Sequence, residues 1–107
     1  MSKSLTCFTT YVSGTSGYNI WSNGYCEQWG SIKVKANTET AVTLSKTFSN
    51  TNYNVNGTNN TYFNNSRYSC APCIKKTATN KITIGNVEDV DVTYSWFVCG
   101  YLAAGQY

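Results

Sequence analysis

One dipeptide, Asn23-Gly24, constrains this chain more than any other feature. Asn-Gly between two runs of apolar and aromatic residues is the strongest short-range signal for a two-residue β-hairpin, because its type I′ turn needs positive φ at both positions. The flanking segments 18–22 and 25–30 have this character. They are therefore predicted to pair as antiparallel strands.

The register of this hairpin predicts large side chains on both of its faces. A two-residue loop would place Trp21 opposite Cys26. One face would then carry Tyr18, Ile20, Tyr25 and Trp29, and the other would carry Trp21, Cys26 and Gln28. Such a strand pair must be covered on both sides. A second sheet and another subunit are the expected covers.

Further strands are predicted from alternation. The clearest is 91–101, where Val92, Tyr94, Trp96 and Val98 alternate with Thr93, Ser95, Phe97 and Cys99. Shorter strands are expected within 4–12, 31–35, 41–48, 53–55, 68–75 and 81–84, and 56–67 is expected to be a long loop that could contain one short strand. About eight short strands at regular spacing predict an all-β, antiparallel sandwich.

The composition supports β structure in a single domain, residues 1–107. The chain has 15 Thr, 13 Asn and 11 Ser, but only 3 Leu and 6 Ala, so strand and turn formers replace helix formers. Because aliphatic residues are scarce, aromatic residues must supply much of the core. Trp21, Trp29 and Trp96 are each expected to be largely buried.

The charge pattern argues against a nucleic-acid partner. The net charge is +3 and 12% of residues are charged, without a basic cluster beyond Lys75-Lys76. No apolar run approaches the 18 residues of a membrane helix, so membrane insertion is not expected. The opening residues do not resemble a signal peptide.

The side chains give little support for catalysis. The sequence contains no His, which removes Ser-His and Cys-His machinery. Glu88 and Asp91 could form the carboxylate pair of a glycosidase, but acids also gather in solvated turns before strands. The turn is the preferred interpretation, and the chain is not expected to be an enzyme.

The five cysteines cannot all pair within one chain. We interpret them as mostly free thiols of a protein folded in a reducing cytosol. Cys70 and Cys73 could hold zinc with two of Cys7, Cys26 and Cys99, but no second close pair exists. A local disulfide or an incidental pair is preferred, and no metal or cofactor is expected.

The polar segment 56–68 is the predicted binding loop. It interleaves aromatic rings with amides, which suits sugar recognition because rings stack on sugar faces and amides bind hydroxyls. The candidate receptor-binding residues are Tyr62, Asn64, Asn65, Arg67 and Tyr68. Two alternatives stay open: Tyr62 or Phe63 fills the core, or the contact lies in the 13–17 or 85–91 turn.

Two segments resemble the distal tips of phage and prophage tail fibres. Residues 13–18 read Ser-Gly-Thr-Ser-Gly-Tyr, and residues 23–30 read Asn-Gly-Tyr-Cys-Glu-Gln-Trp-Gly. The structural motif of the resemblance comprises Trp21, Asn23, Gly24, Tyr25, Cys26, Gln28, Trp29, Gly30 and Trp96. Residues 56–80 do not match the family pattern.

The resemblance implies a C-terminal tail-fibre domain at the end of a longer fibre. Such domains form homotrimers and attach the virion to a bacterial cell-surface glycan or protein. The fibre would be made and assembled in the host cytoplasm. Two alternatives are a lectin-like carbohydrate-binding module outside any phage and a trimerisation cap without a ligand of its own.

Overall fold

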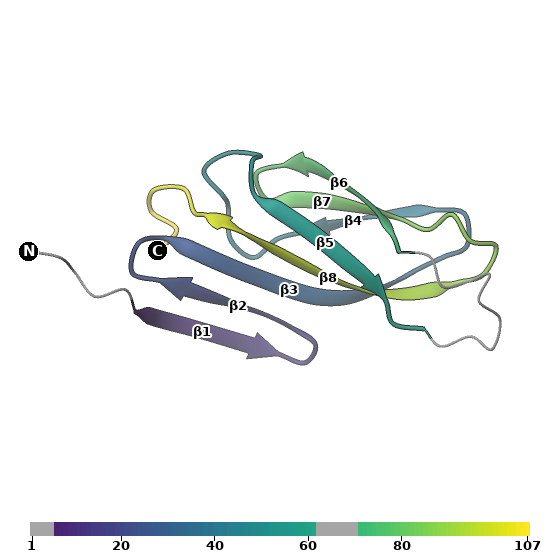
Figure 1. Ribbon diagram of the computed structural model, residues 1–107, viewed down its shortest axis with the longest axis horizontal. Coiled ribbons are helices and arrows are strands. Elements are labelled where there is room, and N and C mark those ends of the chain that lie inside the picture. The colour runs from purple at the N-terminus through teal and green to yellow at the C-terminus, as the bar shows by residue number, and fades with distance from the viewer. Residues whose placement is uncertain (1–5, 62–70) are drawn as a thin grey trace, which may run out of the picture.

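The computed structural model describes residues 6–61 and 71–107, and these residues form two antiparallel sheets without a helix (Figure 1). The five-stranded sheet has the order β1-β2-β3-β8-β5, and the three-stranded sheet has the order β4-β7-β6. The strands are β1 (Cys7–Ser13), β2 (Ser16–Trp21), β3 (Tyr25–Val34), β4 (Glu39–Thr43), β5 (Asn54–Asn59), β6 (Cys73–Ala78), β7 (Lys81–Gly85) and β8 (Val92–Tyr101). The predicted all-β sandwich is confirmed.

The centre of the larger sheet is the long pair β3–β8. Ten consecutive residue pairs join these strands, from Tyr25 opposite Tyr101 to Val34 opposite Val92. The segments 25–30 and 31–35, predicted as separate strands, are therefore one strand. The alternation predicted for 91–101 is confirmed, since Val92, Tyr94, Trp96 and Val98 are all buried.

The register predicted for the β2–β3 hairpin is wrong by one residue. Ile20 pairs with Cys26, so the loop contains three residues instead of two. Gly24 has a φ of 87°, whereas Asn23 does not enter the positive region. The Asn23 side chain instead accepts a hydrogen bond from the Tyr25 backbone N–H at 3.0 Å. A type I turn followed by a left-handed Gly has replaced the type I′ turn.

This shift exchanges the faces of the hairpin. Tyr18 and Ile20 share the inner face with Cys26 and Gln28, while Trp21, Tyr25 and Trp29 share the outer face. The rings of Trp21 and Tyr25 lie 5.5 Å apart there. A one-residue slip always moves a strand's side chains to the opposite face.

The core lies between the inner faces of the two sheets. The larger sheet contributes Val34, Tyr94 and Val98, and the smaller sheet contributes Ile82 and Ile84, all nearly free of solvent contact. The segment after β4 closes one end of this layer, with the rings of Phe48 and Tyr53 stacked 4.5 Å apart.

All three tryptophans were expected to be largely buried, but only one of them is. Trp96 is 9% exposed on the inner face. Trp21 and Trp29 are partly exposed because they lie on the outer face of the five-stranded sheet. None of the described strands covers that face.

Strand β5 continues the short strand predicted at 53–55 as far as Asn59, which corrects the first four residues of the loop predicted for 56–67. Its residues Asn56 and Thr58 are exposed, but the backbone pairs with β8 as an edge strand. The polar side chains give no strand signal, because β propensity reflects packing on neighbours and this strand packs on one side only. Backbone hydrogen bonding to β8 therefore makes this segment a strand.

Candidate functional site

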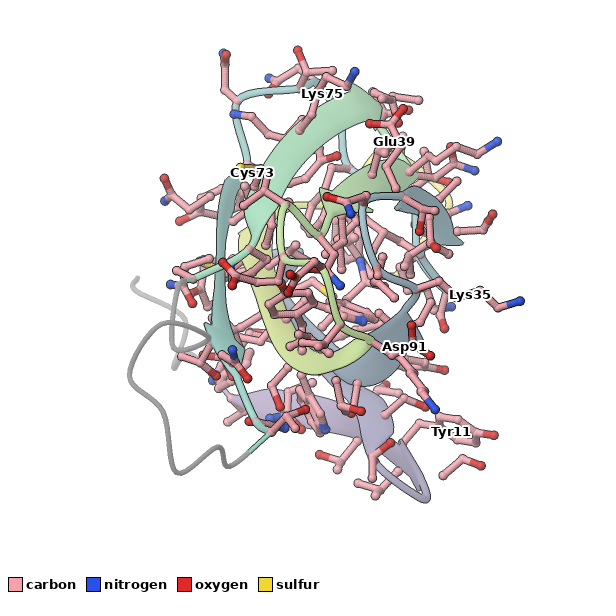
Figure 2. The ribbon with its side chains drawn as sticks, turned by 90° about the vertical axis from the view of Figure 1, so that its right-hand side faces the viewer. Tyr11, Lys35, Glu39, Cys73, Lys75 and Asp91 are labelled. Carbon is pink, nitrogen blue, oxygen red and sulfur yellow. The ribbon has the colours of Figure 1, made fainter. Side chains whose placement is uncertain are left out.

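Two loops form one end of the molecule, opposite the end that holds the C-terminus and the start of β1 (Figure 1). Residues 35–38 connect β3 to β4, and residues 86–91 connect β7 to β8. We call this region the loop end. Figure 2 looks onto it and shows Lys35, Glu39 and Asp91 around the loops.

Asn86 is the centre of the loop end. Its side chain is 2% exposed. The amide nitrogen donates hydrogen bonds to the carbonyl oxygens of Val34 at 3.0 Å and Val90 at 2.8 Å. The amide oxygen accepts from the Glu88 backbone N–H at 2.9 Å and from the Tyr94 hydroxyl at 3.1 Å. One buried side chain therefore ties the 86–91 loop to both central strands.

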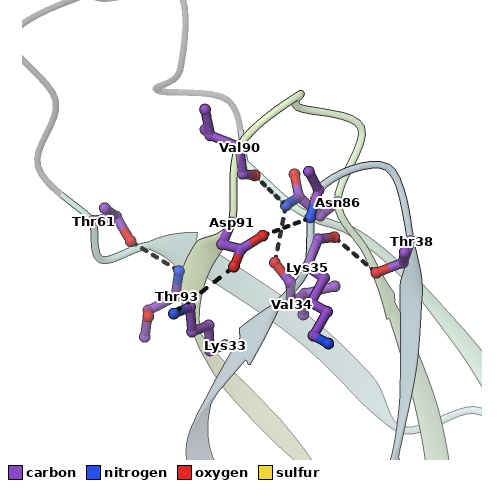
Figure 3. Close-up of polar contacts among 10 residues, drawn as sticks. Lys33, Val34, Lys35, Thr38, Thr61, Asn86, Val90, Asp91 and Thr93 are labelled. Atoms are coloured by element: carbon purple, nitrogen blue, oxygen red, sulfur yellow. Dashed lines mark hydrogen bonds and ion pairs between the residues drawn. The ribbon is translucent and has the colours of Figure 1, made fainter.

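Asp91 fastens the two loops to each other (Figure 3). Its Oδ1 accepts a hydrogen bond from the Ala36 backbone N–H at 3.0 Å, and its Oδ2 lies 3.8 Å from Nζ of Lys33. The lysine side chain is 67% exposed, so this ion pair contributes little stability. The carboxylate acts mainly as a backbone acceptor that fixes the 35–38 turn.

Backbone hydrogen bonds complete the connection. Asn37 N–H donates to the Glu88 carbonyl at 2.9 Å, and Asn86 N–H donates to the Thr38 carbonyl at 2.9 Å. Asn37 has a φ of 54°, a left-handed conformation that Asn adopts more readily than most residues. The loop end is therefore held by its own hydrogen bonds.

An open cavity of about 500 Å³ lies beside these loops. Its lining includes the polar residues Asn37, Thr38 and Glu39 and the exposed Val87. Val87 is 65% exposed, so an apolar side chain stands among polar neighbours. The cavity therefore offers amide, hydroxyl and carboxylate groups and one apolar side chain to a contact.

The predicted receptor-binding residues lie outside the described part of the chain. Tyr62, Asn64, Asn65, Arg67 and Tyr68 all fall within 62–70. On one side of this segment Thr61 accepts a hydrogen bond from Thr93 N–H at 2.8 Å, and on the other side β6 begins at Cys73 (Figures 2 and 3). Thr61 precedes the segment directly, and Cys73, which follows the segment, lines the cavity of the loop end.

Sequence reasoning did not identify Asn86 as the organising residue. The sequence predicts the 85–91 turn only as an alternative contact. An Asn two residues before an acidic pair is an available signal, because Asn side chains commonly bind the backbone two residues ahead. Its further bonds to Val34 and Tyr94 depend on the tertiary fold.

Two of the motif residues, Gln28 and Cys26, are buried in the core. Gln28 is 1% exposed, and its amide donates to the Lys46 carbonyl at 3.1 Å and accepts from the Lys46 N–H at 3.0 Å. Burial raises the pKa of the Cys26 thiol to about 12. The Gln28 side chain therefore fastens the segment after β4 to β3, and the Cys26 thiol fills space in the core.

The two acids singled out in the sequence, Glu88 and Asp91, both belong to the loop end. Asp91 is engaged by the 35–38 turn, and Glu88 is 9% exposed. Cys26, Cys73 and Cys99 are free thiols. Among the described residues no three His, Cys, Asp or Glu side chains gather as metal ligands would. The same residues include no helix suited to crossing a membrane.

The fold is an antiparallel β-sandwich whose polar loops lie at the end opposite its C-terminus. This arrangement defines a class of small all-β domain that presents loops at one end. Residues 20–101 match the family described as the C-terminal domain of gp53-like tail fibre proteins. The match covers most of the sequence. The chain belongs to this family of phage tail-fibre C-terminal domains.

Two solved structures have a similar fold. The C-terminal residues 323–691 of the R2 pyocin fibre of P. aeruginosa align with 86% of this chain at 20% identity and a TM-score of 0.71. An N-truncated R2-type pyocin tail fibre aligns with 94% at 19% identity and a TM-score of 0.72. The aligned regions cover 25% and 39% of those chains. A search of curated protein sequences gave no significant match.

Proposed function

We propose that this domain attaches a phage tail fibre to the bacterial surface, as a homotrimer, through its loop end. The receptor is a cell-surface glycan or protein. One observation carries the proposal: the exposed loops 35–38 and 86–91 are fixed by the buried Asn86 and by Asp91. Loops that are ordered before binding lose less entropy when a receptor is bound.

The direction of the chain supports the loop end as the contact surface. Strand β1 begins at the opposite end of the molecule (Figure 1). A fibre shaft that precedes residue 6 would join there, so the loop end would point away from the shaft. We propose that residues 1–107 are the C-terminal domain of such a fibre. The similar pyocin fibres are longer chains.

The 62–68 residues remain part of the proposed contact surface. In support, Thr61 is bonded to the start of β8 next to the loop end, and Cys73 lines the cavity. Alanine variants at Asn64, Arg67 and Tyr68 are expected to keep assembly and melting temperature but to lose attachment. Unchanged attachment in all three would assign the contact to the 35–38 and 86–91 loops alone.

The outer face of the five-stranded sheet supports the homotrimer. Aromatic side chains gather on it without a cover from any described strand: Trp21, Tyr25, Trp29, Phe97 and Tyr101. An obligate interface buries on the order of 2,000 Å² in total. Trimer symmetry would also present three loop ends, so weak single contacts would add up to firm attachment. Light scattering during size exclusion tests this, and a stable monomer at micromolar concentration would refute it.

We further propose that the domain binds without cleaving its receptor. Asp91 supports a turn, and the chain has no His. Polysaccharide from a susceptible host is expected to keep its chain length after incubation with the pure protein. Shortened chains would make Glu88 and Asp91 the first residues to substitute.

The family membership favours a fibre of the virion, made in the host cytoplasm, over a lectin-like module outside any phage. The free thiols Cys26, Cys73 and Cys99 agree with folding in a reducing compartment. A trimerisation cap without a ligand would assemble equally well. Attachment to host cells is therefore the deciding property.

The decisive experiment compares two exposed lysines. Lys35→Glu changes the charge at the loop end, while Lys81→Glu makes the same change in β7, away from it. The labelled trimer with Lys35→Glu is expected to lose attachment to host cells, whereas Lys81→Glu keeps it. Equal attachment of both variants, together with an unaffected Val87→Asp variant, would refute the loop end as the contact surface.

A further inference from the structure

Strand β4 is an edge strand that turns a row of backbone groups outward. In an antiparallel pair, only every second residue hydrogen-bonds to the neighbouring strand. At the start of β4, Asn86 N–H donates to the Thr38 carbonyl at 2.9 Å, and just after its end Leu44 N–H donates to the Asn80 carbonyl at 2.7 Å. The even-numbered residues therefore face β7. The outward N–H and C=O groups, which no other described residue reaches with a hydrogen bond, belong to Glu39, Ala41 and Thr43.

The other edges of the two sheets are blocked or covered. β6 follows Pro72 and contains Lys75 and Lys76, and both β6 and β1 have a shift of register of the kind that a bulge makes. β5 lies against β6, since a Cβ atom on Gly57 would lie 2.7 Å from Cδ1 of Ile74. Proline, lysine and bulges are the usual devices that keep an edge strand from pairing with another chain. β4, which reads Glu-Thr-Ala-Val-Thr in an unbroken register, has none of them.

A groove lies beside this free edge, because the smaller sheet has fewer strands than the larger one. β1 and β2 project beyond the smaller sheet, so none of the described strands lies over the start of β2 (Figure 1). A cavity of about 230 Å³ marks the groove, and its lining includes Val42 and Thr43 on one side and Ser16 and Ile32 on the other. Ile32 and Val42 are half-buried and give it an apolar floor. We call the free edge of β4 and this cavity the β4 groove.

Charged side chains stand at the two ends of the β4 groove. Glu39 is exposed at the start of β4 and also lines the cavity at the loop end, so the groove continues into the proposed contact surface. Glu39 forms no ion pair with another described residue. Lys46 follows β4, and its Nζ lies 5.4 Å from the centre of the Tyr18 ring. Between the two charges, the small side chains of Ala41 and Thr43 let another backbone approach the edge.

We propose that the β4 groove binds an extended polypeptide segment of a protein on the host surface, which adds to β4 as a further strand. A row of N–H and C=O groups at strand spacing is complementary to a second backbone about 4.8 Å away. Alternate side chains of the segment would be apolar, to contact Ile32 and Val42, and a basic side chain would face Glu39. This role rests on the proposed attachment function and makes the receptor a protein. Pairing of β4 with β4 of another copy is two-fold and does not build a trimer.

Hydrogen exchange on the assembled full chain tests the proposal, with membrane vesicles from a susceptible host as the probe. Bound vesicles are expected to slow exchange of the outward amides in the peptide 39–43 at least about tenfold. Vesicles treated with proteinase K should lose this effect, whereas vesicles with periodate-oxidised glycans should keep it. The reverse pattern would make the receptor a glycan and overturn the proposal. Vesicles that bind without slowing exchange in 39–43 would also overturn it, and vesicles that do not bind at all would refute the attachment function with it.

Two variants of one residue locate the site. Ala41→Pro removes an outward N–H that β7 does not use, and Ala41→Ser keeps it as the matched control. Ala41→Pro is expected to weaken vesicle binding at least about tenfold, and Ala41→Ser to leave it unchanged. Light scattering and thermal unfolding check both variants; if Ala41→Pro does not fold, Thr43→Lys takes its place as a charged block on the same edge.

The outcomes separate the β4 groove from the loop end. Equal binding of Ala41→Pro and Ala41→Ser would overturn the β4 groove, and a loss with Lys35→Glu in the same assay would leave the loop-end attachment standing. A change of oligomeric state in Ala41→Pro would show that β4 contacts another copy of the chain, which also overturns the proposal.

Discussion

The indole ring of Trp96 lies against the backbone of Gly30, its direct partner across β3 and β8. A Cβ atom on Gly30 would lie 2.5 Å from Cζ2 of Trp96, closer than two carbon atoms can approach. Residue 30 must therefore lack a side chain for the ring to fill the inner face. This contact gives a physical reason for the last Gly of the 23–30 motif.

Gly30→Ala is expected to destabilise the fold by roughly 1–3 kcal/mol, because the ring must leave its position in the core. Urea unfolding measures this difference. Gly85→Ala is the matched control: it also lies in a strand, but its new Cβ would make only an ordinary contact at 3.5 Å. Comparable losses in both variants would show that strand propensity, not the Trp96 contact, sets the cost.

Asn86→Ala is expected to destabilise the protein more than a typical surface change. It removes the partners of four groups, including the buried Tyr94 hydroxyl. Each buried group left without a partner costs roughly 1–3 kcal/mol. Thermal unfolding and hydrogen exchange of the Glu88 amide measure the effect on stability and on the loop.

Asn86→Asp separates the two halves of that network. The carboxylate keeps the acceptor for Glu88 N–H and Tyr94 but loses the donor to Val34 and Val90. The variant is expected to be less stable than the parent at neutral pH, because its carboxylate charge faces the carbonyl oxygens of Val34 and Val90. The difference should become smaller on acidification, which protonates the carboxylate. A loss of stability that does not change with pH would mean that the missing N–H donors, and not the charge, cause it.

Because Cys26 is buried, the free energy of unfolding is expected to decline at high pH. Folding raises its thiol pKa from 9.0 to about 12, so the folded state binds the proton more tightly than the unfolded state. This contribution is complete below pH 9 and is lost as the pH rises toward 12. The free energy of unfolding of the parent should therefore fall more steeply above pH 9 than that of Cys26→Ala. Parallel curves would contradict the burial of this thiol.

Thiol labelling gives a second, independent prediction about the cysteines. A maleimide reagent at neutral pH is expected to modify the exposed Cys73 rapidly in the native protein. Cys26 is fully buried and should react only after denaturation. Peptide mass spectrometry reads both sites from one sample. Rapid native labelling of Cys26 would show that the core opens on the labelling timescale.

The sequence predicted the sandwich well because alternation was strong wherever one face was buried. Strand β8 is the clearest case, and its buried set from Val92 to Val98 was identified correctly. The register of β2 and β3 was not, since Asn23-Gly24 suits two turn types and only Gly24 adopts positive φ. Local propensity does not distinguish a two-residue from a three-residue loop when both place Gly at a left-handed position.

The candidate sites were harder to predict because they depend on tertiary contacts. Asn86 acts through Val34 and Tyr94, which are distant or unremarkable in the sequence. Only the start of β5 is predicted, as the short strand at 53–55, while its continuation to Asn59 falls in the predicted loop. The residues of this continuation are polar and lack apolar alternation, so its extent could not be predicted from the sequence.

Rings packed on glycines also restrict how this framework can evolve. Gly24 lies against the ring of Tyr107, and Gly30 against that of Trp96. A larger residue at either glycine collides with its ring unless the ring changes too, so each pair must be replaced together. Val87 and Lys35 belong to no such pair and can be replaced one step at a time. Mutations would therefore accumulate fastest at the loop end, while epistasis keeps the sandwich unchanged beneath it.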